Sequence, residues 1–143
     1  NATSYRGVEN PFGHIGKLTD GIKMARIGGF NGFYAYSSPR DYGVAGVSAC
    51  RFIANASDYY GYIRSIHLGE SGDITPEAYG GSSSTYFCDI AGLGIENQDG
   101  AESVFSFGGM ANSGAGAGLC DMMSRSEAIL RLPIHGTRLC YLP

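Results

Sequence analysis

The sequence predicts one α+β domain, with short antiparallel strands and a single main helix. Glycine makes up 23 of the 143 residues, more than twice the usual share of ~7%. Ten tyrosines and seven phenylalanines accompany these glycines. Such a composition is typical of a turn-rich fold with few helices, and 143 residues is an ordinary length for one domain. Because no internal repeat or linker interrupts the chain, we expect the domain to cover residues 1–143.

The main helix is predicted over residues 11–20. Asn10 suits the N-cap position, and Pro11 suits the first helical position because a proline loses no useful donor there. Phe12, Ile15 and Leu18 follow at a spacing of three residues, which gives the segment one apolar side. A glycine at position 21 stands where a helix C-cap favours it.

Runs rich in aromatic and β-branched residues predict the strands. Gly28 and Gly29 are expected to join two strands as a hairpin, and Phe105 and Phe107 are expected to share one face of a later strand. We expect loops at 37–48, 69–81 and 92–100. We also expect the strands around Phe105 and Leu139 to be neighbours or near-neighbours in the sheet. The predicted strands cover residues 3–6, 22–27, 30–36, 49–54, 60–68, 82–89, 103–107 and 136–141.

Residues 110–135 differ from the predicted scaffold on either side of them. Small residues fill positions 111–118, and the mixed residues that follow show no clean period. Pro133 argues against a continuous helix, so an irregular surface loop is expected over 121–135, with or without one helical turn. Met122 and Met123 fit either a gap-filling core or a binding role. The candidate ligand-binding residues are Met110, Ala111, Asn112, Ser113, Ala115, Asp121, Met123, Arg125, Ser126, Ile129, Arg131 and Pro133.

Known catalytic and metal-binding patterns are missing from the sequence. The three histidines stand far apart, and Ala115 occupies the position where a phosphate loop needs lysine. There is no GxSxG motif and no EF-hand pattern. We therefore expect a protein that is not an enzyme and that uses no metal or cofactor.

The charge and hydropathy of the sequence restrict the kinds of partner that this protein is expected to bind. Ten basic and thirteen acidic residues leave a net charge of −3, which does not favour a nucleic-acid partner. No apolar run approaches 18 residues, so no membrane insertion is expected. The four cysteines (Cys50, Cys88, Cys120 and Cys140) lack zinc or redox spacing, and free thiols are favoured over any of their three possible pairings.

Several motifs resemble a group of proteins from phages of gut bacteria. The opening Tyr5-Arg6-Gly7-Val8-Glu9-Asn10-Pro11-Phe12-Gly13-His14-Ile15, followed by Asp20-Gly21-Ile22, is similar to the start of that group. The segment from Gly80 to Asp89 is similar to a GGSSSTYxxD segment in the same group. The end of this chain resembles the variable proteins of diversity-generating retroelements. It has a glycine pair, then an Ala-Gly-Leu stretch, and then Gly136-Thr137-Arg138-Leu139.

This resemblance implies a C-type-lectin-like scaffold whose variable region would be 105–141. It implies a host-receptor-binding tip of a phage tail or fibre protein on the virion surface, homotrimeric in full length, with the bacterial cell surface and a pilus-tip adhesin as the alternative. Formylglycine-generating enzymes share that scaffold, but no cysteine pair here matches their site. The Glu-Pro-Asn and Gln-Pro-Asp tripeptides of calcium-dependent sugar-binding relatives are also missing, so no calcium site is expected.

Overall fold

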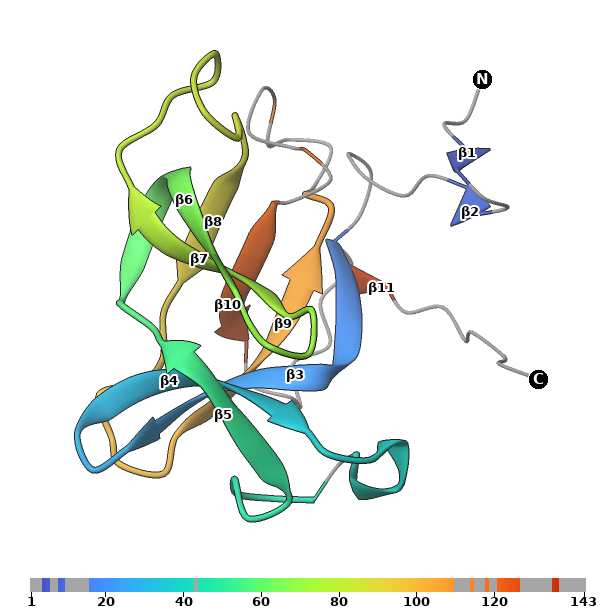
Figure 1. Ribbon diagram of the computed structural model, residues 1–143, viewed down its shortest axis with the longest axis vertical. Helices are drawn as coiled ribbons and strands as arrows, with labels where there is room; N and C mark the ends of the chain where they lie inside the picture. The colour runs from blue at the N-terminus through green and yellow to red at the C-terminus, as the bar shows by residue number, and fades with distance from the viewer. Residues whose placement is uncertain are drawn as a thin grey trace.

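The chain forms a barrel-like sheet that is nearly closed (Figure 1). The structure is a computed structural model that describes residues 4–5, 8–9, 16–42, 44–109, 114, 118, 121–126 and 135–136. Its strands are β1 (Ser4–Tyr5), β2 (Val8–Glu9), β3 (Gly16–Ile27), β4 (Phe30–Tyr36), β5 (Cys50–Asn55), β6 (Tyr59–Leu68), β7 (Ile74–Tyr79), β8 (Ile90–Leu93), β9 (Glu102–Phe107), β10 (Met122–Ser126) and β11 (His135–Gly136).

The main sheet mixes one parallel pairing with antiparallel ones along its path. Its order is β5-β4-β3-β9-β10-β8-β6-β7, and β10 runs parallel to β8. The short β11 pairs parallel to the start of β3, and β1 and β2 form a separate pair. In Figure 1 the β6–β7 hairpin crosses in front of β9 and β10, while β3, β4 and β5 form the lower part of the view.

The two edge strands, β5 and β7, are linked by an ion pair. Nη2 of Arg51 in β5 lies 2.5 Å and 2.6 Å from the two carboxylate oxygens of Asp73, the residue before β7. Pro76 lies within β7, and an edge strand tolerates proline because its outer N–H groups need no strand partner. The Arg51–Asp73 pair therefore spans the remaining gap in the sheet.

The core lies inside the sheet and is built around stacked aromatic rings. Phe33 of β4 and Phe105 of β9 are fully buried, with ring centroids 5.7 Å apart. Met24 packs in the same cluster, and its sulfur accepts a 3.6 Å hydrogen bond from the Ser124 hydroxyl. This contact joins β3 to β10, which are separated in the sheet by β9.

Several predicted elements are confirmed. The hairpin of β3 and β4 turns through Gly28 and Gly29, whose φ angles of 59° and 83° match the type I′ turn that suits twisted strands. The strands predicted at 49–54, 60–68 and 103–107 correspond to β5, β6 and β9 within a residue. Phe105 and Phe107 do share a face, with centroids 6.1 Å apart.

The α+β, C-type-lectin-like fold class is wrong, because the described residues contain no α-helix and form an all-β structure. Only a 3₁₀ turn, η1 (Pro39–Asp41), is helical among them. Residues 16–20 of the predicted helix 11–20 lie in β3, and residues 11–15 are outside the described part. Leu18 and Thr19 pair with Ser106 and Phe105 of β9, so sheet pairing prevailed over the local capping signal.

The structure also corrects the strands and loops predicted in the second half of the chain. Residues 82–89, predicted as a strand, form turns with one isolated bridge between Ser82 and Thr85. Residues 74–79, in a segment predicted as loop, form β7, and residues 92–93 of another predicted loop belong to β8. The irregular loop predicted over 121–135 contains β10, an inner strand on which Met122 and Ser124 are buried. Leu139 and its expected pairing lie outside the described residues.

No helix in the described part of the chain is long and apolar enough to cross a membrane.

The core predicts a large difference between two phenylalanines. Phe105→Ala should lower the free energy of unfolding by about 3–5 kcal/mol, because it removes a fully buried ring. Phe30→Ala should change it by no more than about 0.5 kcal/mol, because Phe30 is 77% exposed. Chemical denaturation of both variants measures the difference, and equal losses would contradict this account of the core.

Candidate functional site

The outer side of β3, β4 and β5 carries a cluster of exposed apolar side chains. Residues of β4 alternate, so that Phe33 and Ala35 are buried while Phe30 and Tyr34 belong to the opposite set. Phe30 is 77% exposed, and Phe52 of β5 is 53% exposed. With Ile27, which pairs with Phe30 at the hairpin end, these side chains define what we call the aromatic face: Ile27, Phe30, Tyr34 and Phe52.

Gly32 allows two rings of this face to come together. A Cβ atom added to Gly32 would lie 2.9 Å from the Phe52 ring and 3.0 Å from the Tyr34 ring. Both rings therefore lie over the bare backbone of Gly32, with their centroids 5.6 Å apart in an edge-to-face arrangement. Such a pair is worth about 0.5–1.5 kcal/mol beyond its buried area, which helps to hold both rings in place.

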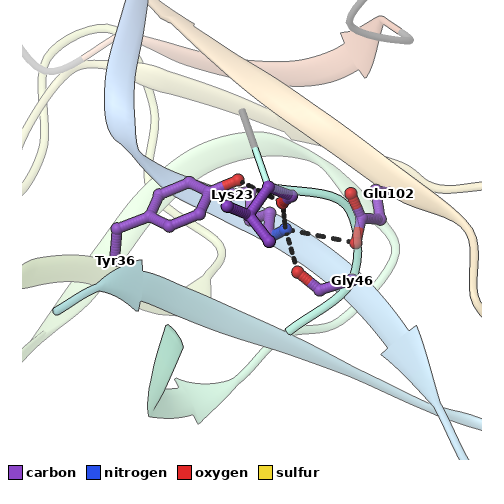
Figure 2. Close-up of polar contacts among 5 residues, drawn as sticks. Lys23, Tyr36, Gly46 and Glu102 are labelled. Atoms are coloured by element: carbon purple, nitrogen blue, oxygen red, sulfur yellow. Dashed lines mark hydrogen bonds and ion pairs between the residues drawn. The ribbon is translucent and has the colours of Figure 1, made fainter. Parts of the chain in front are cut away.

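A buried lysine lies beside this face and holds the loop that follows β4 (Figure 2). Lys23 pairs with Tyr34 across β3 and β4, and its residue is only 3% exposed. Its Nζ atom lies 3.1 Å from Glu102 Oε1 and donates to the carbonyl oxygens of Val44 and Gly46. Charge, hydrogen bonds and the loop carbonyls together satisfy the ammonium group.

Tyr36 completes the Lys23 cluster, which we define as Lys23, Tyr36, Glu102 and the carbonyls of Val44 and Gly46. The ammonium lies 4.9 Å from the Tyr36 ring centroid, and the Tyr36 hydroxyl donates a 3.0 Å hydrogen bond to Val44. Burial lowers the pKa of Lys23, but its contacts with Tyr36 and Glu102 outweigh burial and raise this pKa above its usual value. Lys23 therefore stays a cation at neutral pH and holds residues 44–46 against β3.

A second polar feature is the carboxyl pair of Asp89 and Asp121. Asp121 is 3% exposed, and its Oδ1 atom is buried without a hydrogen-bond partner in the described part of the chain. Burial and the nearby charge of Asp89 raise the pKa of Asp121 to about 6. Gly118, whose carbonyl accepts from the Asp121 N–H at 3.3 Å, lies directly against the Asp89 carboxylate.

The structure describes four of the twelve predicted site residues. Asp121 is buried, and Met123 is half-buried with its side chain over Gly92, where a Cβ would lie 2.4 Å from the Met123 sulfur. Arg125 and Ser126 are the last two residues of strand β10. The remaining eight lie outside the described residues: Met110, Ala111, Asn112, Ser113, Ala115, Ile129, Arg131 and Pro133.

Sequence reasoning missed the aromatic face, although a signal for it was present. In the predicted strand 30–36, Phe30 and Tyr34 stand four residues apart and so fall on one face. The position of Phe52 beside Tyr34 depends on the register between β4 and β5, which shifts between Phe33 and Tyr34. The alternation of residues within one strand does not show how that strand is aligned with its neighbour, so it could not predict this register.

The described residues offer little metal chemistry. No group of three or more histidine, cysteine, aspartate or glutamate side chains among them lies close enough together to hold a metal ion. Cys50 and Cys88 carry free thiols, while Cys120 and Cys140 lie outside the described part. Burial, the largest influence, raises the pKa of the Cys50 thiol, which makes it a poor nucleophile at neutral pH.

Comparison with known proteins found no matching family model, no matching curated protein and no matching solved structure.

The Asp121 carboxyl predicts a pH dependence of stability. Because its folded pKa of about 6 exceeds the usual 3.8, the fold favours the protonated acid. The stabilisation is full below about pH 4 and is lost as the pH rises through 6. Asp121→Asn should therefore raise the free energy of unfolding at pH 8 by about 2–3 kcal/mol and flatten its change between pH 4 and 7.

Urea denaturation at each pH measures this effect, with the exposed Asp58→Asn as a control that removes a charge from the surface. A wild-type protein whose stability does not fall between pH 4 and 7 relative to Asp121→Asn would contradict the burial described for Asp121.

Proposed function

We propose that this chain is a non-enzymatic recognition domain that binds a molecule on a cell surface through its aromatic face. The observation that carries the proposal is the exposure of Phe30 and Phe52 on the outer side of β4 and β5, whose opposite side packs into the core through Phe33. Single exposed apolar residues are ordinary, whereas several of them on one face of a sheet point to an interaction surface. Here Ile27 pairs with Phe30, and Tyr34 packs against Phe52. Aromatic rings give large contact area at a low cost in side-chain entropy.

The surroundings of the aromatic face support binding by preformed contacts. The Tyr34 and Phe52 rings are already packed against each other, so little of their freedom remains to be lost on binding. The Lys23 cluster holds the neighbouring loop at residues 44–46. A partner that meets this surface would therefore find the rings in position.

The biological setting we propose is the host-receptor-binding tip of a phage tail or fibre protein, displayed on the virion surface and trimeric in full length. The resemblance of the segments at 5–15 and 80–89 to proteins of gut-bacterial phages supports this setting. The C-type-lectin-like scaffold is not part of the proposal. Two further statements stay predictions: that residues 105–141 are diversified, and that residues 110–135 bind the ligand.

Binding to cells tests the proposal. We expect the fluorescently labelled domain to bind at least one strain in a panel of cultured gut bacteria. The double variant Phe30→Ser, Phe52→Ser should bind that strain at least about 10-fold more weakly, which corresponds to about 1.4 kcal/mol. Its melting temperature, measured in parallel, should show that the domain stays folded.

Tyr60→Ser is the matched control, because Tyr60 is 54% exposed and lies on β6, beside Met123 over Gly92. It should leave binding within about twofold of the wild type, since it does not touch the aromatic face. Loss of binding in Tyr60→Ser with full binding by the Phe30 and Phe52 variant would place the contact surface around Met123 instead. Failure of the wild-type domain to bind any strain would contradict the proposed setting.

A further inference from the structure

The barrel contains an apolar cavity that is lined by none of the residues of the aromatic face. Its volume is about 210 Å³, and it lies between the β6–β7 hairpin and strands β9 and β10. Ile63, Thr75 and Met122 line it and are at most 4% exposed, whereas Ile74 and Phe87 line it and are 56% and 41% exposed. The buried residues form its floor, and Ile74 and Phe87 form its mouth.

One polar atom in the lining has no partner among the residues that the structure describes. The Thr75 hydroxyl is fully buried and makes no hydrogen bond with any of them. An unmade hydrogen bond on a buried hydroxyl is costly, so such a group calls for an explanation. Water is a poor one here, because a buried water needs two to four polar partners and Thr75 supplies the only side-chain hydroxyl among the lining residues.

The mouth of the cavity is held by a strained turn. Tyr86 and Cys88, on either side of Phe87, have φ angles of 59° and 58°. Residues with a Cβ seldom adopt this left-handed conformation, and such strain concentrates at functional sites. The two flanking residues thereby fix the backbone of Phe87, a residue that lines the cavity. Glycine at both flanking positions would remove this strain.

The size and chemistry of the cavity define its occupant. An apolar cavity of about 150 Å³ is enough for benzene, so about 210 Å³ accommodates one substituted six-membered ring. None of the described residues that line the cavity carries a charged side chain, and an ionised ligand would lose its hydration without gaining a partner among them. The occupant must therefore be neutral, mostly apolar, and able to hydrogen-bond with one hydroxyl.

We propose that this cavity is a binding site for a small neutral ring compound that carries one hydroxyl group. The ring packs against Ile63, Met122 and Phe107, and its hydroxyl pairs with the Thr75 hydroxyl. Phe87 covers the ring at the mouth. This site is separate from the aromatic face and does not depend on the role proposed for that face.

Two probes of nearly the same shape test the site: para-cresol, which has the hydroxyl, and para-xylene, which has a methyl group in its place. Titration followed by NMR should show that the wild-type domain binds para-cresol at least about 10-fold more tightly than para-xylene. In Thr75→Val, which keeps the shape of the side chain, this preference should fall to about twofold or less. Binding of para-xylene to Thr75→Val should equal or exceed its binding to the wild type.

Comparing the affinities of the wild-type domain for para-cresol and para-xylene tests the proposed site even without the Thr75→Val variant. No binding of either probe, or equal affinity for both, would overturn the proposal, because a cavity that selects only by size does not use Thr75. A preference for para-cresol that survives in Thr75→Val would also overturn it.

A second variant tests the part assigned to Phe87. Tyr86→Gly combined with Cys88→Gly removes the strain from both flanking residues and should weaken para-cresol binding at least about threefold. Ser84→Gly, in the same turn at a residue without a positive φ, should leave the affinity within about 1.5-fold of wild type. Unchanged affinity in the double glycine variant would overturn the role of the strained turn.

Discussion

The buried ammonium of Lys23 is the interaction on which the outer surface of this protein depends. An isolated charge in such a place would cost several kcal/mol. Glu102, the Tyr36 ring and the carbonyls of Val44 and Gly46 surround it instead. These groups come from β9, from the end of β4 and from the loop after it, so one side chain of β3 fixes three segments. The aromatic face lies on the same side of β3 and β4 as Lys23, so the contacts of Lys23 also help to hold its strands in place.

A second ion pair connects the two candidate binding regions. Arg51 precedes Phe52 of the aromatic face, and Asp73 precedes Ile74 and Thr75 at the cavity. The 2.5 Å contact between Arg51 and Asp73 spans the gap between the edge strands β5 and β7. Exposed edges invite pairing with other chains, and here an ion pair links the two edge strands to each other.

The sequence predicted the parts of this fold that local chemistry determines. The glycine pair at 28–29 and the alternation around Phe105 were sufficient for the second half of β3 and for β4 and β9. The capping signal at Asn10 and Pro11 misled, because the pairing of Leu18 and Thr19 with β9 is a contact between residues far apart in the chain. The aromatic face, the Lys23 cluster and the cavity likewise depend on strand register and loop placement, which composition and spacing do not contain.

Lys23 is buried, charged and held in place, and the rate at which its amine is chemically modified tests this most directly. Acetylation with a limiting reagent, followed by peptide mass spectrometry, gives the rate at Lys23 in the native and in the guanidinium-unfolded protein. We expect a native rate at least about 100-fold lower, which corresponds to an opening free energy of about 2.7 kcal/mol. A native rate within about threefold of the unfolded rate would contradict it.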